Sequence, residues 1–78
     1  MTNLEKYENA FTGIFSVGNN ELSKLKYQDI PEWDSIGHMT LIAALEETFD
    51  IMFDTDDIID LSSFEKGKEI LKKYNVEF

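Results

Sequence analysis

The chain of 78 residues and 9.0 kDa is long enough for one small domain with a modest core. It has no Cys and one His, which excludes disulfides, thiolate metal sites, a Cys nucleophile and a multi-histidine metal site. No apolar run approaches the roughly 18 residues that cross a bilayer, and the N-terminus lacks a signal-peptide pattern, so we expect a soluble, cytoplasmic protein.

The formal net charge of −9 is concentrated in the middle of the sequence. Residues 29–60 hold ten acidic residues and no Lys or Arg, whereas the two flanking segments are close to neutral. Such a segment repels nucleic acids and anionic membrane surfaces and attracts a partner with a basic patch. We therefore expect no nucleic-acid or membrane partner. Charge runs are also common on surfaces that are merely solvated, so function needs a second signal.

The first predicted element is an amphipathic helix over residues 3–16. The pattern Thr2-x-x-Glu5 matches a capping box, and apolar residues follow it at spacings of three and four. Gly18-Asn19-Asn20 is predicted to end this helix. A long ordered loop follows over residues 18–33.

The second predicted helix starts at Asp34 or Ser35 and runs to about Asp50. Projected at about 100° per residue, it has two apolar faces. The wide face is predicted to point to the core and contains His38, Leu41, Ile42, Leu45 and Phe49. The narrow face lies among carboxylates, which is typical of a docking surface with apolar contact at its centre and charge around it. Its apolar residues can also be incidental exposed side chains, which are common, and the segment without Lys or Arg favours docking. The residues of this predicted docking face are Ile36, Met39, Ala43, Glu46, Glu47 and Asp50.

Two further helices are predicted in the last third of the chain. Asp54 or Thr55 can cap a short helix through residues 56–60. The pattern Ser62-x-x-Glu65 matches a capping box for a last helix over residues 63–74. No segment has the period-two alternation of a strand. The sequence thus predicts an all-α fold, a small bundle of three main helices and one short helix with a long first loop.

Ser35 is the candidate functional residue, because with Asp34 as N-cap it becomes the first residue of the second helix. Its hydroxyl would then be exposed at a helix N-terminus, where free backbone N–H groups and the helix dipole favour a phosphate. The simpler interpretation is that Asp34 and Ser35 only cap the helix.

In this setting the sequence resembles the acyl carrier proteins over essentially its whole length. The similarity lies in the size, the helix plan, the long first loop and the acidic second helix. The matching segments are Glu32-Trp33-Asp34-Ser35-Ile36-Gly37-His38-Met39, Leu41-Ile42-Ala43-Ala44-Leu45-Glu46-Glu47-Thr48-Phe49 and Asp56-Asp57-Ile58. The combination of Trp33, Ile36, Gly37 and His38 is more similar to free-standing carriers of specialised pathways, such as surface-glycan modification or secondary metabolism, than to housekeeping fatty-acid carriers.

The resemblance implies a covalent cofactor on Ser35. In that family the matching serine carries 4′-phosphopantetheine, which a separate phosphopantetheinyl transferase moves from coenzyme A with Mg²⁺. The matching aspartate, here Asp34, helps the transferase engage the site. Acyl groups then travel as thioesters on the thiol of the arm.

The resemblance also implies how the carrier works. Residues 1–78 form a single acyl carrier domain, expected to be a monomer and not itself an enzyme. The predicted docking face meets acyl-loading and acyl-transfer enzymes with basic patches, and the apolar space between the second, third and fourth helices shelters an acyl chain.

Three other interpretations compete with a carrier. Residues 54–65 have the acidic spacing of an EF-hand, but Ile58 and Ile59 stand where an oxygen ligand and Gly are needed, which excludes that loop. Weak divalent-cation binding by the carboxylates of residues 54–60 stays open. A hydrolase built on Ser35, His38 and Asp34 is disfavoured, because Asp34 adjoins Ser35 and no nucleophile elbow is present. The main alternative is an acidic helical protein-interaction module without a prosthetic group.

Overall fold

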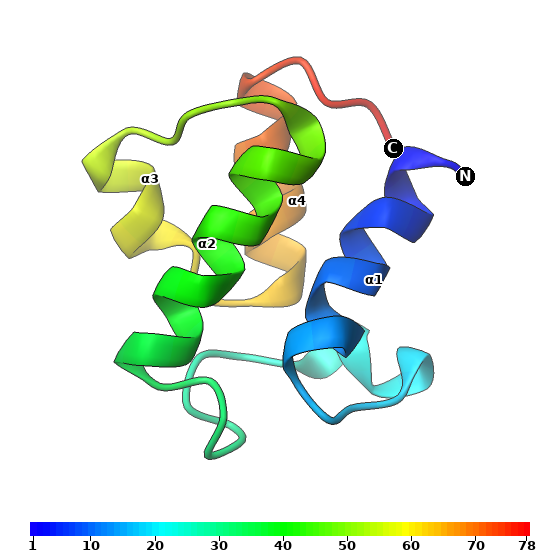
Figure 1. Ribbon diagram of the computed structural model, residues 1–78, viewed down its shortest axis with the longest axis vertical. Helices are drawn as coiled ribbons and strands as arrows, with labels where there is room; N and C mark the ends of the chain where they lie inside the picture. The colour runs from blue at the N-terminus through cyan, green and yellow to red at the C-terminus, as the bar shows by residue number, and fades with distance from the viewer.

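The computed structural model describes all 78 residues as an all-α fold with no strands. The helices α1, α2 and α4 enclose the core, and the short α3 lies at the edge beside α2 (Figure 1). The elements are α1 (Asn3–Ile14), the 3₁₀ helix η1 (Asn19–Lys24), α2 (Ser35–Phe49), α3 (Thr55–Asp60) and α4 (Phe64–Lys73). The predicted bundle of three main helices, one short helix and a long first loop is confirmed. None of these helices combines the length and the apolar character that a membrane span requires.

The start of α1 follows the prediction, but its end does not. The Thr2 hydroxyl accepts from the Glu5 N–H and the Glu5 carboxylate accepts from the Thr2 N–H, which completes the capping box. The helix ends at Ile14, and Gly18 instead precedes η1 within the long loop. The prediction that Gly18-Asn19-Asn20 ends α1 is therefore wrong. The chain leaves the helix earlier because extended Phe15 is buried in the core.

The predicted capping box of α4 is also wrong, by one residue. Ser63 is the N-cap, and its hydroxyl accepts from the Lys66 N–H at 3.0 Å. Ser62 cannot start the helix because its carbonyl accepts from the Tyr27 N–H at 2.8 Å, which ties this segment to the first loop. Glu65 pairs instead with Lys68, at 3.0 Å.

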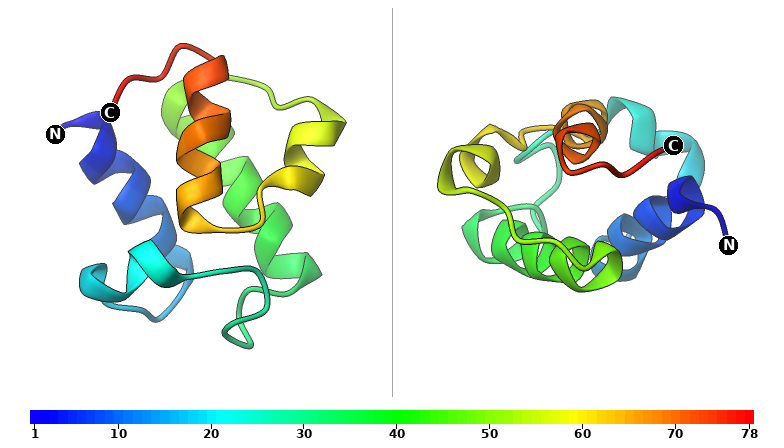
Figure 2. Two further views of the ribbon diagram at one scale, coloured as in Figure 1. Left: turned by 180° about the vertical axis from the view of Figure 1, so that it is seen from behind. Right: turned by 90° about the horizontal axis from the view of Figure 1, so that it is seen from above.

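The core is rich in aromatic residues, several of which come from α1, from its C-cap residue Phe15 and from the loop before α2. Phe11 lies edge-on to Trp33, with ring centroids 5.5 Å apart, and Phe15 stacks on Trp33 at 5.3 Å. Seen from above, α1 lies alongside α2 and α4 covers the opposite side of the core (Figure 2). The buried hydrophobic residues are Tyr7, Phe11, Phe15, Leu22, Leu25, Trp33, Leu41, Ile42, Leu45, Phe53, Leu61, Phe64, Ile70, Leu71 and Val76.

Gly67 lets α4 approach α1 closely. The Tyr7 hydroxyl donates to the Phe64 carbonyl at 2.7 Å, and a Cβ at Gly67 would collide with that hydroxyl oxygen. Burial raises the pKa of Tyr7 above its usual value. The cost of Gly within a helix is therefore offset by a close contact between helices.

Candidate functional site

Ser35 is an exposed side chain on the first residue of α2. The Asp34 carboxylate caps the helix by accepting from the Gly37 N–H at 2.9 Å. The N–H groups of Ser35 and Ile36 have no acceptor within the protein. The site therefore combines an exposed hydroxyl with two unpaired backbone donors, which the first turn of a helix leaves available to an anion.

The first loop brings a second hydroxyl to Ser35. Tyr27 Oη lies 3.3 Å from Ser35 Oγ, within hydrogen-bonding distance. The loop is held in place because the Phe64 N–H donates to the Leu25 carbonyl at 3.0 Å and Lys26 forms a β-bridge with Ser63. Eight residues separate Tyr27 from Ser35, and the sequence gives no periodic signal for this contact.

A mainly apolar pocket of about 360 Å³ opens beside Ser35. It lies between the first half of α2, α3 and the first loop. Its lining consists of Tyr27, Ser35, His38, Met39, Ile58, Ile59, Leu61 and Ser62. The pocket differs from the expected space between the second, third and fourth helices, since α4 contributes no residue to it.

His38 forms one wall of this pocket and joins α2 to α3. Trp33 Nε1 donates to His38 Nδ1 at 3.0 Å, and His38 Nε2 lies 2.7 Å from the Ile58 carbonyl. Because the indole N–H can only donate, Nδ1 is the acceptor and Nε2 carries the proton that is donated to Ile58. The expectation of a partly buried, structural His38 is confirmed.

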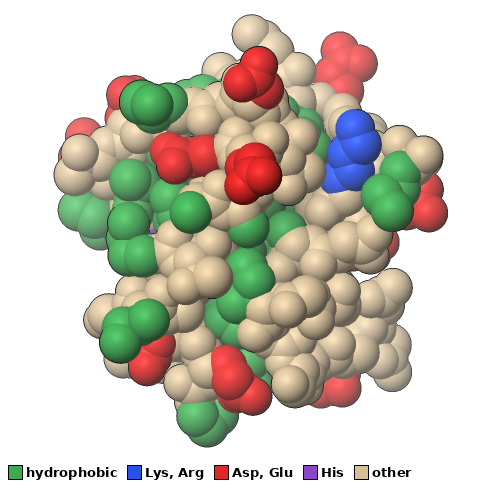
Figure 3. Space-filling view, viewed as in Figure 1, with side chains coloured by type: hydrophobic (Ala, Val, Ile, Leu, Met, Phe, Trp, Pro, Cys, Tyr) green, Lys and Arg blue, Asp and Glu red, His purple; other side chains and the backbone are tan.

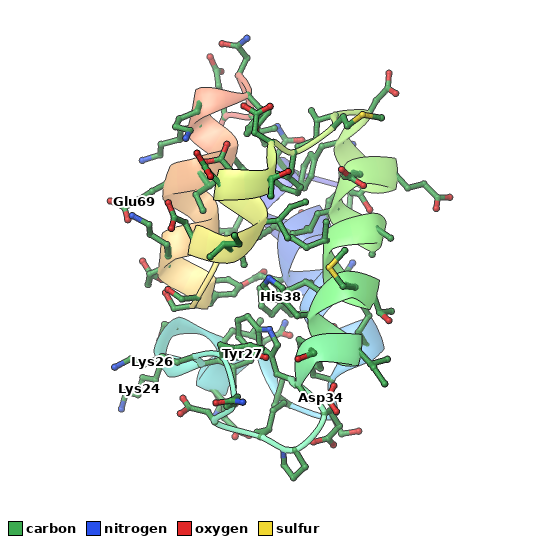
Figure 4. All side chains as sticks on the ribbon, turned by 90° about the vertical axis from the view of Figure 1, so that its left-hand side faces the viewer. Lys24, Lys26, Tyr27, Asp34, His38 and Glu69 are labelled. Atoms are coloured by element: carbon green, nitrogen blue, oxygen red, sulfur yellow. The ribbon has the colours of Figure 1, made fainter.

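The side chains of Tyr27, Trp33 and His38 form one aromatic cluster, and Tyr27 and His38 of this cluster line the pocket. The His38 ring lies nearly coplanar with Trp33, at 15° and with ring centroids 6.2 Å apart, and Tyr27 meets His38 edge-on with ring centroids 5.5 Å apart. Figure 4 shows Tyr27 and His38 next to each other on the inner side of α2, above Asp34. Both nitrogens of His38 and the Asp34 carboxylate have other partners, so Ser35, His38 and Asp34 are not linked into a hydrolase-like relay.

The predicted docking face of α2 is largely exposed. Ile36 and Met39 are 79% and 52% exposed, and Ala43, Glu47 and Asp50 are also exposed. Hydrophobic side chains gather over the first half of α2 and over α3, with carboxylates nearby (Figure 3).

Two features of this face were not visible in the pattern of the second helix. Ile59 of α3 is 71% exposed and also lines the pocket, so the apolar surface extends from α2 to α3. Glu46 is only partly exposed, and its carboxylate accepts from the Phe53 N–H at 3.0 Å. Glu46 therefore also holds the α2–α3 connection.

Asp57 is buried, unlike the other acidic residues of α3. Its carboxylate accepts from Lys73 Nζ and from the Tyr74 hydroxyl, both at 2.6 Å, which fastens α3 to the end of α4. The hydrogen bond from Lys73, followed by that from Tyr74, lowers the pKa of Asp57, and the same contacts raise the pKa of Lys73 and of Tyr74. No group of three or more His, Asp or Glu side chains is placed to hold a metal ion.

Comparisons with protein-family models, with curated proteins and with solved structures found no match to this chain.

Proposed function

We propose that this protein is an acyl carrier protein in which Ser35 bears a 4′-phosphopantetheine arm. The observation that carries the proposal is the exposed Ser35 hydroxyl at the capped start of α2, directly beside an apolar pocket. Unpaired N–H groups occur at the start of every helix, so the pocket is what distinguishes Ser35 from a residue that only begins a helix.

The residues around Ser35 suit such an arm. The N–H groups of Ser35 and Ile36 can donate to its phosphate, and the Tyr27 hydroxyl can donate to the ester oxygen. When bound, the arm supplies the thiol that forms thioesters, which this chain cannot supply because it has no Cys.

Attachment needs a transferase and coenzyme A. The Ser35 oxygen forms a bond to the pantetheine-side phosphorus of the coenzyme A pyrophosphate, and the bond from that phosphorus to the bridging oxygen breaks. Adenosine 3′,5′-bisphosphate leaves, and the serine proton passes to a base of the transferase. Asp34 is the residue we assign to transferase engagement.

The exposed face of α2 is the surface that we propose for partner enzymes. Its apolar residues Ile36, Met39 and Ala43 are flanked by Glu47 and Asp50, in a segment of the chain without Lys or Arg. This charge favours transferases, acyl-loading enzymes and acyl-transfer enzymes with basic patches, and it steers their approach. A flexible tether then raises the local concentration of the cargo to about the mM range.

The proposal is tested by incubating the protein with coenzyme A, Mg²⁺ and a broad-specificity transferase, followed by intact-mass measurement. We expect one arm on the wild type and none on Ser35→Ala. Ser62→Ala is the matched control, because Ser62 is an exposed serine that lines the same pocket. An unmodified wild type, or an arm that persists in Ser35→Ala, would leave an acidic interaction module as the better description.

A further inference from the structure

Among the core-facing residues of α2, only His38 lines the pocket beside Ser35. Ile42 and Leu45 follow His38 on the same face of α2 at helical spacing, yet both are buried in the core and neither lines the pocket. The Nε2–H group of His38 donates from α2 to the Ile58 carbonyl of α3 at 2.7 Å, and both residues line the pocket.

Hydrogen bonds to Trp33 and Ile58 hold the His38 ring in place. Trp33 is fully buried, so its indole N–H would be left unpaired if His38 swung away. Displacing the ring would also leave the Ile58 carbonyl without the short hydrogen bond that it now accepts. A chain of aliphatic carbons offers neither a donor nor an acceptor in exchange, so it cannot compensate for opening this wall.

We propose that the hydrogen-bonded chain Trp33–His38–Ile58 sets the depth of the pocket, so that the carrier shelters short acyl groups and leaves the remainder of a long aliphatic chain outside the core. His38 is thus a specificity-determining residue for cargo length. This inference rests on the proposed attachment of the arm at Ser35.

The test loads the protein with butanoyl or dodecanoyl groups from the corresponding coenzyme A thioesters and confirms each by mass. Isotope-filtered NMR then detects which methyl groups contact the chain. In the wild type we expect both chains to contact Met39 and Ile59 at the mouth and neither to contact Ile42 or Leu45. The melting temperature should be equal for the two loaded forms, because the extra carbons of dodecanoyl bury no further surface.

Two variants of His38 test its role, one without and one with the hydrogen-bonding groups of its side chain. In His38→Ala we expect dodecanoyl contacts with Ile42 or Leu45 and a melting temperature that rises with chain length. His38→Gln, whose amide keeps a donor and an acceptor, should behave as the wild type. Should His38→Ala fail to fold because the indole is unpaired, the double variant W33F/H38A removes that donor as well.

The outcomes separate the two proposals. Dodecanoyl contacts with Ile42 or Leu45 in the wild type would overturn the role of His38, and so would identical behaviour of the wild type and a folded His38→Ala. The first of these results needs only the butanoyl and dodecanoyl forms of the wild type. A wild type that gains no mass at all would instead overturn the carrier function, and the inference on cargo length with it.

Discussion

Tyr27 Oη and Ser35 Oγ lie 3.3 Å apart, at the junction of the first loop and α2. The Tyr27 ring is at the same time held edge-on against both Trp33 and His38. The hydroxyl that we propose as the attachment point is therefore oriented by a residue whose own position is set by the aromatic cluster.

Replacing Tyr27 by Phe should slow the loading of Ser35 without unfolding the protein. The ring keeps its packing, whereas the lost hydrogen bond, worth about 0.5–1.5 kcal/mol, no longer orients Ser35 Oγ. We expect the initial rate of arm transfer to fall by about two- to ten-fold, measured by mass spectrometry at limiting transferase. A loading rate equal to that of the wild type would show that Tyr27 does not position Ser35.

Gly37→Ala should destabilise the start of α2. A Cβ at this position would collide with the Glu32 carbonyl and would also lie 3.3 Å from the ring of Phe15. We expect a loss of about 1–3 kcal/mol in the free energy of unfolding, the usual range for overpacking, measured by urea denaturation.

Gly13→Ala is the matched control for this variant. Gly13 also lies within a helix, α1, but a Cβ there would meet nothing within 4 Å. Its replacement should stabilise the protein by about 0.5–1 kcal/mol through helix propensity alone. Equal effects of the two substitutions would contradict the close contact with Glu32.

The anchor of α3 at Asp57 should weaken in acid. Its folded-state pKa is lowered by Lys73 and Tyr74, so the unfolded chain binds the proton more readily. The stabilisation is complete above the ordinary pKa of 3.8 and is lost as the pH falls through the lower folded value. Asp57→Asn should therefore lower the melting temperature at pH 7 and have a smaller effect near pH 3.

Asp56→Asn provides the comparison for the Asp57 variant. Asp56 lies on the same short helix but is exposed and has no ion-pair partner. The same chemical change there should shift the melting temperature little at either pH. A difference between Asp57→Asn and the wild type that stayed constant from pH 7 to pH 3 would exclude the ionised carboxylate as its source.

The carboxylates beside the exposed face of α2 should control the rate at which basic partners arrive. Asp50 ends α2 in a left-handed conformation, with φ 53° and ψ 52°, so Asn is the replacement that removes its charge and still suits the backbone. We expect Glu47→Lys combined with Asp50→Asn to reduce the association rate with the transferase several-fold at low salt, measured by stopped-flow fluorescence. The effect should shrink at high salt because exposed charges are screened.

Glu69→Lys controls for net charge. Glu69 is exposed on α4 and projects away from α2 (Figure 4). Its reversal should leave the association rate nearly unchanged. If it slowed association as much as the α2 variant, overall charge and not a localised docking face would govern the encounter.

Local patterns in the sequence were enough to predict the order of the four α-helices and the position of Ser35 at the start of α2. The positions of apolar residues along α2 separate buried Leu41, Ile42 and Leu45 from exposed Ile36 and Met39, as the structure confirms. The Asp-Ser pair likewise placed Asp34 as N-cap and Ser35 as the first helical residue, as found. Helical periodicity and capping act over three or four residues, so one sequence contains the information.

The contacts that shape the pocket depend on how distant segments meet. The sequence alone did not place Tyr27 beside Ser35, Ile58 against His38 twenty residues away, or Lys73 on the buried Asp57. Each of these contacts joins elements whose relative position follows from the path of the loops and the packing of the aromatic core. Periodicity within one helix carries no information about that packing, so only the tertiary structure decided what surrounds Ser35 and how deep its pocket reaches.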